Sequence, residues 1–234
     1  MSSRFDTSLL PPDPDLSFES TLWECGILSI AGVDEAGRGP LAGPVSAAAV
    51  ILPPGVQIAT KLYGVRDSKQ MRREEREYWE TVIKDHSCYC AVGFASVEEI
   101  DQIGIVPATR LAAQRALDSL NALPEHILLD FIHLPECSIP QTSLIKGDCR
   151  SLSIASASVL AKTARDACLR ELDQVYPGYG LAEHKGYGTP AHLRALKELG
   201  PCPIHRRSFH PVCDLPELKS GLNAESKIIP EGIS

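Results

Sequence analysis

Short apolar segments alternate with longer segments whose apolar residues recur at helical spacing along most of the chain. Apolar runs at 28–33, 45–52 and 88–95 predict three buried strands, and a charged segment at 71–86 predicts an exposed helix between the last two. Because these strands follow one another with one helix inserted, the simplest arrangement is an antiparallel meander.

In the second half of the chain, strands alternate with helices. A capping-box pattern at 96–99 opens a short helix, and a longer helix is predicted over 107–120. Strands at 126–130 and 143–145 follow, and then a long helix over 152–176. Since this alternation favours parallel pairing, the sequence predicts an α/β fold with a mixed sheet, antiparallel first and parallel later, flanked by helices.

The last part of the chain predicts a small helical appendage. Residues 178–188 form a loop rich in glycine and tyrosine, and residues 190–199 form a helix closed by Gly200. A basic loop follows at 201–211. We expect this appendage to belong to the main domain.

The two ends of the chain differ in composition from the rest. Residues 1–25 contain prolines among acids and serines, which predicts a loosely ordered arm, and residues 214–234 are expected to form a flexible tail. Residues 26–213 remain as a single domain, which suits a chain of 234 residues that is 44% hydrophobic and 23% charged.

Other features of the composition concern the protein's surroundings. No apolar run approaches the roughly 18 residues that span a bilayer, and the N-terminus lacks the apolar centre of a signal peptide. We therefore expect a cytoplasmic protein without membrane contact. The eight cysteines include no Cys-x-x-Cys pair, which favours buried, reduced thiols over a disulfide or zinc site.

The charge is unevenly distributed along the chain. The formal net charge is −7, yet residues 140–213 hold ten Lys or Arg against six acids, a local excess of +4. Many acids lie instead in residues 1–25, where five acids against one base give −4. The overall charge therefore does not exclude a polyanionic partner on the later part of the chain.

Four acidic residues lie at, or just past, the ends of predicted strands: Asp34, Glu35, Asp130 and Asp148. If those strands are parallel neighbours, the carboxylates converge at the sheet edge where ligands bind in open α/β sheets. Carboxylates without matching histidine or cysteine ligands suit Mg²⁺ or Mn²⁺. The alternative interpretation is a set of separate, solvated acids in turns.

The segments that carry these acids resemble type 2 ribonuclease H in its bacterial form, from about residue 28 to 212. The most specific block is the run from Asp34 to Val45, Asp-Glu-Ala-Gly-Arg-Gly-Pro-Leu-Ala-Gly-Pro-Val. Shorter blocks follow in the family's order, and they begin at Asp67, Lys146, Ala155, Arg165, His184 and His205. One departure is Phe131, where the family usually has glycine after its third acid.

The resemblance implies a ribonuclease H-like fold and a monomer that cuts RNA in RNA–DNA hybrids. It also implies cutting at single ribonucleotides embedded in duplex DNA, which leaves a 3′-hydroxyl and a 5′-phosphate. The four acids fall on the family's metal-binding carboxylates, for Mg²⁺ or Mn²⁺. Gly37, Arg38 and Gly39 fall on the segment that reads the 2′-hydroxyl, and Tyr187 falls on the ring that packs against the next deoxynucleotide's sugar.

Several basic residues are candidate phosphate contacts. We expect about half of them to contact phosphates, since most surface lysines and arginines are only solvated. They are Lys69, Lys146, Lys162, Arg165, His184, Lys185, Arg206 and Arg207. Asp166 has Lys162 and Arg170 at helical spacing, which predicts an ordinary ion pair. The rival functions are a non-catalytic nucleic-acid binding module of the same fold and a metal-dependent phosphatase acting on small substrates.

Overall fold

The computed structural model describes residues 10–130 and 132–216, and Phe131 lies outside these residues. A five-stranded sheet has the order β3-β2-β1-β4-β5. Its strands are β1 (Ile30–Ala36), β2 (Val45–Ile51), β3 (Tyr89–Ala95), β4 (His126–Asp130) and β5 (Gln141–Leu144). The first three pair antiparallel, whereas β4 pairs parallel to β1 and β5 pairs parallel to β4, which confirms the predicted mixed sheet.

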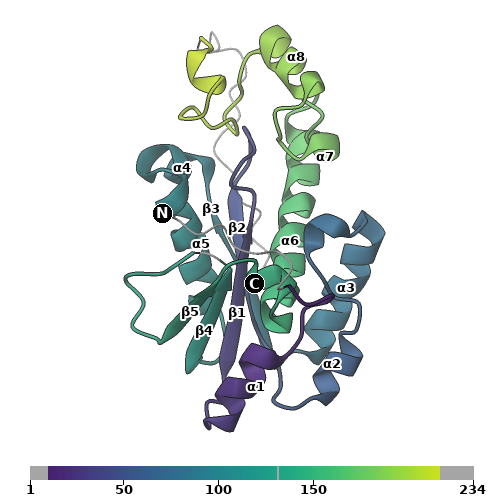
Figure 1. Cartoon of the computed structure of the whole chain (residues 1–234). Helices are drawn as coiled ribbons and strands as arrows, with labels where there is room; N and C mark the ends of the chain where they lie inside the picture. The colour runs from purple at the N-terminus through teal and green to yellow at the C-terminus, as the bar shows by residue number, and fades with distance from the viewer. Residues whose placement is uncertain (1–9, 131, 217–234) are drawn as a thin grey trace.

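Helices cover both faces of this sheet and extend beyond one end of it (Figure 1). The α-helices are α1 (Ser17–Glu24), α2 (Gln57–Lys61), α3 (Arg73–His86), α4 (Val97–Ile103), α5 (Ile105–Asp118), α6 (Leu152–Val175), α7 (Leu181–His184) and α8 (Pro190–Leu199). The described ranges also contain the short 3-10 helices η2 (Ser68–Gln70), η3 (Gly147–Cys149) and η4 (Val212–Asp214). None of the helices in these ranges is long and apolar enough to cross a membrane.

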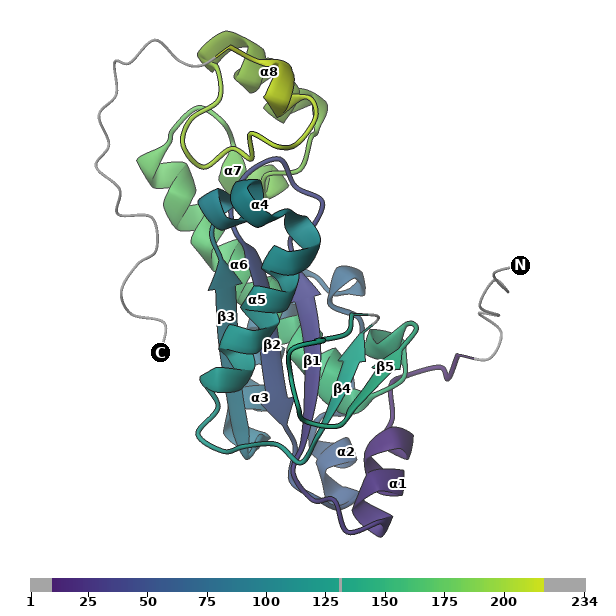
Figure 2. The same ribbon diagram turned by 90° about the vertical axis from the view of Figure 1, so that its left-hand side faces the viewer.

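Two apolar layers hold the sheet between α5 and α6, which lie on opposite faces (Figure 2). The alternation of side chains along β2 divides its alanines, so that Ala47 and Ala49 pack on the α5 side and Ala48 on the α6 side. The α6 helix approaches β1 closely, since a Cβ atom at Gly32 would lie 2.3 Å from the Ser153 carbonyl carbon. Glycine at this position therefore brings the strand that carries Asp34 against α6.

The appendage has its own apolar cluster. Leu41 and Ala42 from the loop after β1 pack with α6, α8 and the segment around Ile204. The predicted loop 178–188 contains the short helix α7, which the sequence did not predict. The appendage is thereby joined to the loop that follows the first two acids.

The predicted loose arm is wrong for the part of residues 1–25 that forms α1. Glu19 is buried in this helix, and its Oε1 accepts hydrogen bonds from Ser151 Oγ (2.6 Å) and Ser153 N (3.0 Å) at the start of α6. A carboxylate at a helix N-terminus satisfies free N–H groups and favours the helix dipole. Glu19, one of the acids that suggested a solvated arm, thus caps the N-terminus of α6. Residues 1–9 and 217–234, which include most of the predicted tail, lie outside the described residues.

The structure corrects one further expectation. All eight cysteines are free, but Cys25, Cys88 and Cys213 are exposed rather than buried. Before the helix predicted over 71–86, Ser68 begins η2, and its hydroxyl lies 2.9 Å from Ser158 Oγ. The Asp67 side chain caps η2 by accepting a hydrogen bond from Lys69 N.

Candidate active site

The carboxylates of Asp34, Asp130 and Asp148 come together at the end of the parallel part of the sheet. The β1–β4 ladder ends at the pair Val33 and Leu129, so Asp34 and Asp130 follow at equivalent positions. Asp148 lies in η3, shortly after β5. One oxygen from each of these three side chains lies within 4.8 Å of the other two.

The strand that carries Asp34 is longer than its apolar pattern suggested. β1 continues through Asp34 and Glu35 to Ala36, because its other edge still pairs with β2 there. The acids therefore sit on regular strand backbone on the β2 side, beyond the last residue that pairs with β4. This pairing holds Asp34 on a rigid element although it lies at the open end of the parallel ladder.

Glu35 lies beside this group but is not one of its three members. It lines the same hollow as Asp34 and Asp130, and its Oε1 lies 3.2 Å from Arg38 Nη1. Successive side chains of a strand point to opposite faces, which separates Glu35 from its neighbour Asp34. The structure thus places three predicted acids in one group and the fourth on the adjoining wall.

Burial and the charges of neighbouring acids make Asp34, Asp130 and Glu35 costly to ionise. Burial, followed by the charges of Glu35 and Asp130, raises the pKa of Asp34 well above its ordinary value. Burial also raises the pKa of Asp130, with the Asp148 charge as the next cause, and burial raises the pKa of Glu35. Three neighbouring carboxyls therefore favour an added positive charge.

Several oxygens of these acids have no partner within the described residues. Asp34 Oδ2, Glu35 Oε2 and Asp148 Oδ1 are buried without a hydrogen bond. Unpaired buried carboxylate oxygens are costly unless a cation or a donor meets them. Since all the available ligand atoms are oxygens, the group fits a hard divalent cation such as Mg²⁺ or Mn²⁺.

Two lysines stand at the rim of this group. Lys69 Nζ lies 3.6 Å from Asp148 Oδ2 and 4.0 Å from Asp67 Oδ1, while 73% of its side chain stays exposed. Lys146 is exposed and precedes Gly147, whose N–H donates a 2.8 Å hydrogen bond to Asp130 Oδ1. Both lysines thus remain accessible to a phosphate near the acids.

The glycine-rich segment and the predicted tyrosine border the same hollow. Its lining includes Gly37, Arg38, Gly39 and Tyr187 together with Asp34, and also Ser68, which the sequence did not single out for the site. The Tyr187 ring is near Gly39, since a Cβ atom there would lie 3.8 Å from the ring. Tyr187 is 47% exposed, so its ring is available for contact.

Two predicted phosphate contacts are wrong, because Arg165 and Arg206 are completely buried. Both guanidinium groups donate to backbone carbonyls of the loop after β1 instead. Lys162 lines the hollow, but its Nζ pairs with Asp166 Oδ1 at 2.7 Å. The predicted ion pair of Asp166 with Lys162 is confirmed, whereas Arg170 pairs with Glu77 instead.

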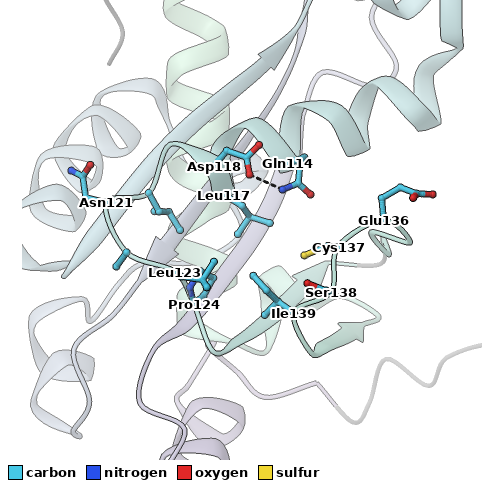
Figure 3. A pocket seen from close by; sticks show the side chains of 12 residues that line it. Gln114, Leu117, Asp118, Asn121, Leu123, Pro124, Glu136, Cys137, Ser138 and Ile139 are labelled. Atoms are coloured by element: carbon cyan, nitrogen blue, oxygen red, sulfur yellow. Dashed lines mark hydrogen bonds between the residues drawn. The ribbon is translucent and has the colours of Figure 1, made fainter.

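A second hollow lies away from the acids, between the end of α5 and residues 136–139 (Figure 3). Its lining is largely apolar, with Leu117, Leu123 and Ile139, and its Asp118 accepts a hydrogen bond from Gln114 (2.7 Å). Within the described ranges, no group of three potential metal ligands lies there. Of these two hollows, the one lined by Asp34 and Asp130 therefore has the oxygen ligands that suit a hard cation.

Comparison with known proteins agrees with this geometry. The family model described as Ribonuclease HII matches residues 31–212. The chain is 55% identical over 207 residues to a ribonuclease HII of Myxococcus xanthus, covering 88% of this chain and 69% of that protein. It is 48% identical over 214 residues to a ribonuclease HII of Chlamydia trachomatis, covering 91% and 95%.

Among solved structures, the ribonuclease H2 of Pyrococcus horikoshii superimposes with a TM-score of 0.67 at 25% identity. The alignment covers 80% of this chain and 96% of that one. The predicted ribonuclease H-like fold is therefore confirmed. The chain belongs to the ribonuclease HII family and is an endonuclease that acts on RNA in RNA–DNA hybrids.

Proposed function

We propose that the protein also nicks duplex DNA on the 5′ side of single embedded ribonucleotides, leaving a 3′-hydroxyl and a 5′-phosphate. The observation that carries this proposal is one hollow lined by Asp34 and Asp130, the Gly37–Gly39 segment and Tyr187. The metal ligands and the groups that would recognise the sugar thus face the same substrate.

The reaction is proposed to use Mg²⁺ or Mn²⁺, held by Asp34, Glu35, Asp130 and Asp148. When bound, two such ions would provide an activated water and stabilise the leaving oxygen. The unpartnered oxygens of Asp34, Glu35 and Asp148 are the ligand atoms that support this assignment. Asp130 is held in place by its bond from Gly147 N, so this carboxylate keeps its orientation toward the others.

Two elements are proposed to recognise the sugars of the ribonucleotide and of the next deoxynucleotide, which both lie on the 3′ side of the cut. Backbone groups of Gly37, Arg38 and Gly39 would meet the 2′-hydroxyl, the group that distinguishes RNA from DNA. Glycine permits this close approach because it has no side chain. The exposed Tyr187 ring would pack against the sugar of the next deoxynucleotide.

Lys69 and Lys146 are proposed to contact phosphates on either side of the cut. Lys69 Nζ is within 4.0 Å of two carboxylates yet stays largely exposed, so it can exchange one of these contacts for a phosphate. Such contacts carry no sequence information. They would hold the duplex over the acids, whatever its base sequence.

The test is a cleavage assay on end-labelled duplex DNA with one ribonucleotide, compared with the same duplex made entirely of DNA. We expect a single nick 5′ of the ribonucleotide with Mg²⁺ or Mn²⁺, and no product with a chelator. Extension of the upstream fragment by a DNA polymerase would verify its 3′-hydroxyl. Equal cutting of the all-DNA duplex, or undiminished cutting with chelator, would contradict the proposal.

A further inference from the structure

Two arginines are buried in the wall behind the Gly37–Gly39 segment. Arg165 and Arg206 are both 0% exposed. Among the described residues, neither guanidinium group forms an ion pair. Burial, with the charge of Arg165 as the next cause, lowers the pKa of Arg206 to about 9. A buried charge is costly to keep, so its contacts should show what it does for the fold.

The contacts of Arg206 are concentrated on one loop. Its Nη2 donates to the Gly37 carbonyl at 2.6 Å, and its Nη1 donates to the Arg38 carbonyl at 2.9 Å. Its Nε and Nη2 donate to the Gly43 carbonyl at 3.0 and 2.9 Å. Its own backbone N–H donates to the Leu41 carbonyl at 2.8 Å. One side chain from the appendage thus fixes the loop after β1 at several points.

These contacts also determine where the amide groups of the loop point. Within a trans peptide unit, the carbonyl and the following N–H point in opposite directions. Because Arg206 holds the Gly37 and Arg38 carbonyls, the N–H groups of Arg38 and Gly39 are directed away from Arg206. The segment lines the hollow and Arg206 does not, so N–H groups that point away from Arg206 would be open to a substrate in the hollow.

Arg165 supports the same loop from α6. It donates to the carbonyls of Ala42 (3.0 Å), Pro44 (2.9 Å) and Lys185 (3.0 Å). The last contact joins the loop to the segment just before Tyr187. Gly37 has φ +97°, and a Cβ atom there would lie 2.0 Å from Arg165 Nε, so only glycine lets the loop lie against this guanidinium.

We propose that Arg206 is a positioning residue for ribose recognition, which holds the Arg38 and Gly39 N–H groups toward the 2′-hydroxyl, with Arg165 in a supporting role. This inference rests on the proposed recognition of the 2′-hydroxyl. Lysine cannot replace Arg206 here, because a single ammonium does not reproduce a planar fork that spans several carbonyls. The positive charge alone is therefore insufficient.

The test measures binding selectivity in the full chain, in an Asp34→Asn background that prevents cutting in Mg²⁺. The readout is the ratio of the Kd for all-DNA duplex to the Kd for the same duplex with one ribonucleotide. We expect Arg206→Lys to lower this ratio at least about fivefold, the effect of losing about one hydrogen bond. The affinity for all-DNA duplex should stay unchanged, because phosphate contacts do not involve Arg206.

The matched control is Arg115→Lys, since Arg115 also donates to a carbonyl, that of Phe94 at 2.8 Å, but does not line the hollow. It should leave the ratio unchanged. A role of Arg206 in stability alone predicts a lower Tm with an unchanged ratio in the folded protein, and that result would overturn the proposal. If Arg206→Lys does not fold, Arg165→Lys provides the same test, with a smaller fall expected and an unchanged ratio again decisive.

The ratio in the Asp34→Asn reference protein distinguishes failure of the positioning role of Arg206 from failure of the proposed recognition of the 2′-hydroxyl. A ratio near one already in Asp34→Asn alone would refute recognition of the 2′-hydroxyl, and the positioning role with it. A high reference ratio that persists in the folded arginine variants would refute only the positioning role.

Discussion

Two buried acidic sites near α6 differ in how their charge is compensated. One contains Asp34 and Asp148, and the other is Asp166. Asp34 and Asp148 are 3% and 2% exposed, and Asp166 is 3% exposed, so their burial is nearly equal. Asp166 pairs with Lys162 at 2.7 Å and with Arg76 at 3.0 Å. Within the described residues, the only cation paired with Asp148 is Lys69, at 3.6 Å, and Asp34 Oδ2 and Asp148 Oδ1 have no hydrogen-bond partner.

This difference separates a carboxylate that is paired within the fold from carboxylates whose oxygens are open to a ligand. A buried carboxylate that the protein pairs with its own cations contributes to structure. A buried carboxylate that the protein leaves unpaired is kept at a cost in stability, and such costs gather at functional sites. Burial alone would not have separated Asp148 from Asp166, whereas their partners do.

The largest effect should follow from removing one charge at the centre of the unpaired group. Asp34→Asn should abolish turnover, because a shared metal site loses a ligand charge. Binding of an RNA–DNA hybrid should persist through the basic residues outside this group. Single-turnover cleavage with excess enzyme and a filter-binding Kd provide the two measurements. Rates like those of the wild type would rule out Asp34 as a metal ligand.

The next prediction tests the comparison directly with a matched pair of variants. Asp148→Asn should reduce the rate at saturating Mg²⁺ by at least about 10²-fold, the lower end for catalytic groups. Asp166→Asn should change the rate much less, because its carboxylate is engaged by Lys162 and Arg76. Both rates are compared at equal folded concentration. The reversed order would mean that α6, and not the end of the sheet, faces the metals.

A smaller effect is expected at the other side of the hollow. Tyr187→Ala should slow cutting at a single ribonucleotide by about tenfold, within the range of aromatic stacking contacts. Its Tm should change little, because Tyr187 is 47% exposed and little apolar surface would leave the core. A large loss of Tm with normal specific activity in the folded fraction would instead indicate a packing role.

The sequence predicted the acid group because its signals are local. Apolar runs that end in an acid indicate strands, and parallel neighbours bring such ends together. The mixed sheet follows from these rules, and so does the convergence of Asp34, Asp130 and Asp148 once β4 lies parallel beside β1. The continuation of β1 through Asp34 depends on pairing with β2, which the apolar pattern of β1 does not contain.

The roles of other charged residues depend on contacts between distant parts of the chain. Arg206 meets the Gly37 carbonyl, 169 positions away, and Glu19 meets Ser151, 132 positions away. A basic residue in a basic loop and an acid in an acidic arm both suggested solvent exposure. Neither neighbourhood contains the carbonyls or helix N-terminus that satisfy these charges in the fold. The composition of the surrounding sequence therefore predicted the wrong exposure for both residues.

The last and smallest prediction concerns the stability of the two aspartate groups without metal. Because the pKa of Asp34 is raised in the folded protein, its carboxyl favours folding below its ordinary pKa of 3.8. That contribution is lost as the pH rises through the folded pKa, and ionised Asp34 then destabilises the metal-free protein. At pH 7 with chelator, Asp34→Asn should therefore raise the Tm by about 2–4 °C, the shift that 1 kcal/mol produces in a domain of this size. The gain should shrink toward pH 4, and it should also shrink with Mg²⁺, since a bound cation removes the repulsion in the wild type.

Asp166→Asn should instead lower the Tm, because it leaves Lys162 and Arg76 without their carboxylate. Thermal unfolding followed by circular dichroism at both pH values, with chelator and with Mg²⁺, measures all of these shifts. Shifts of the same sign in the two variants at pH 7 with chelator would show that the two groups are compensated alike.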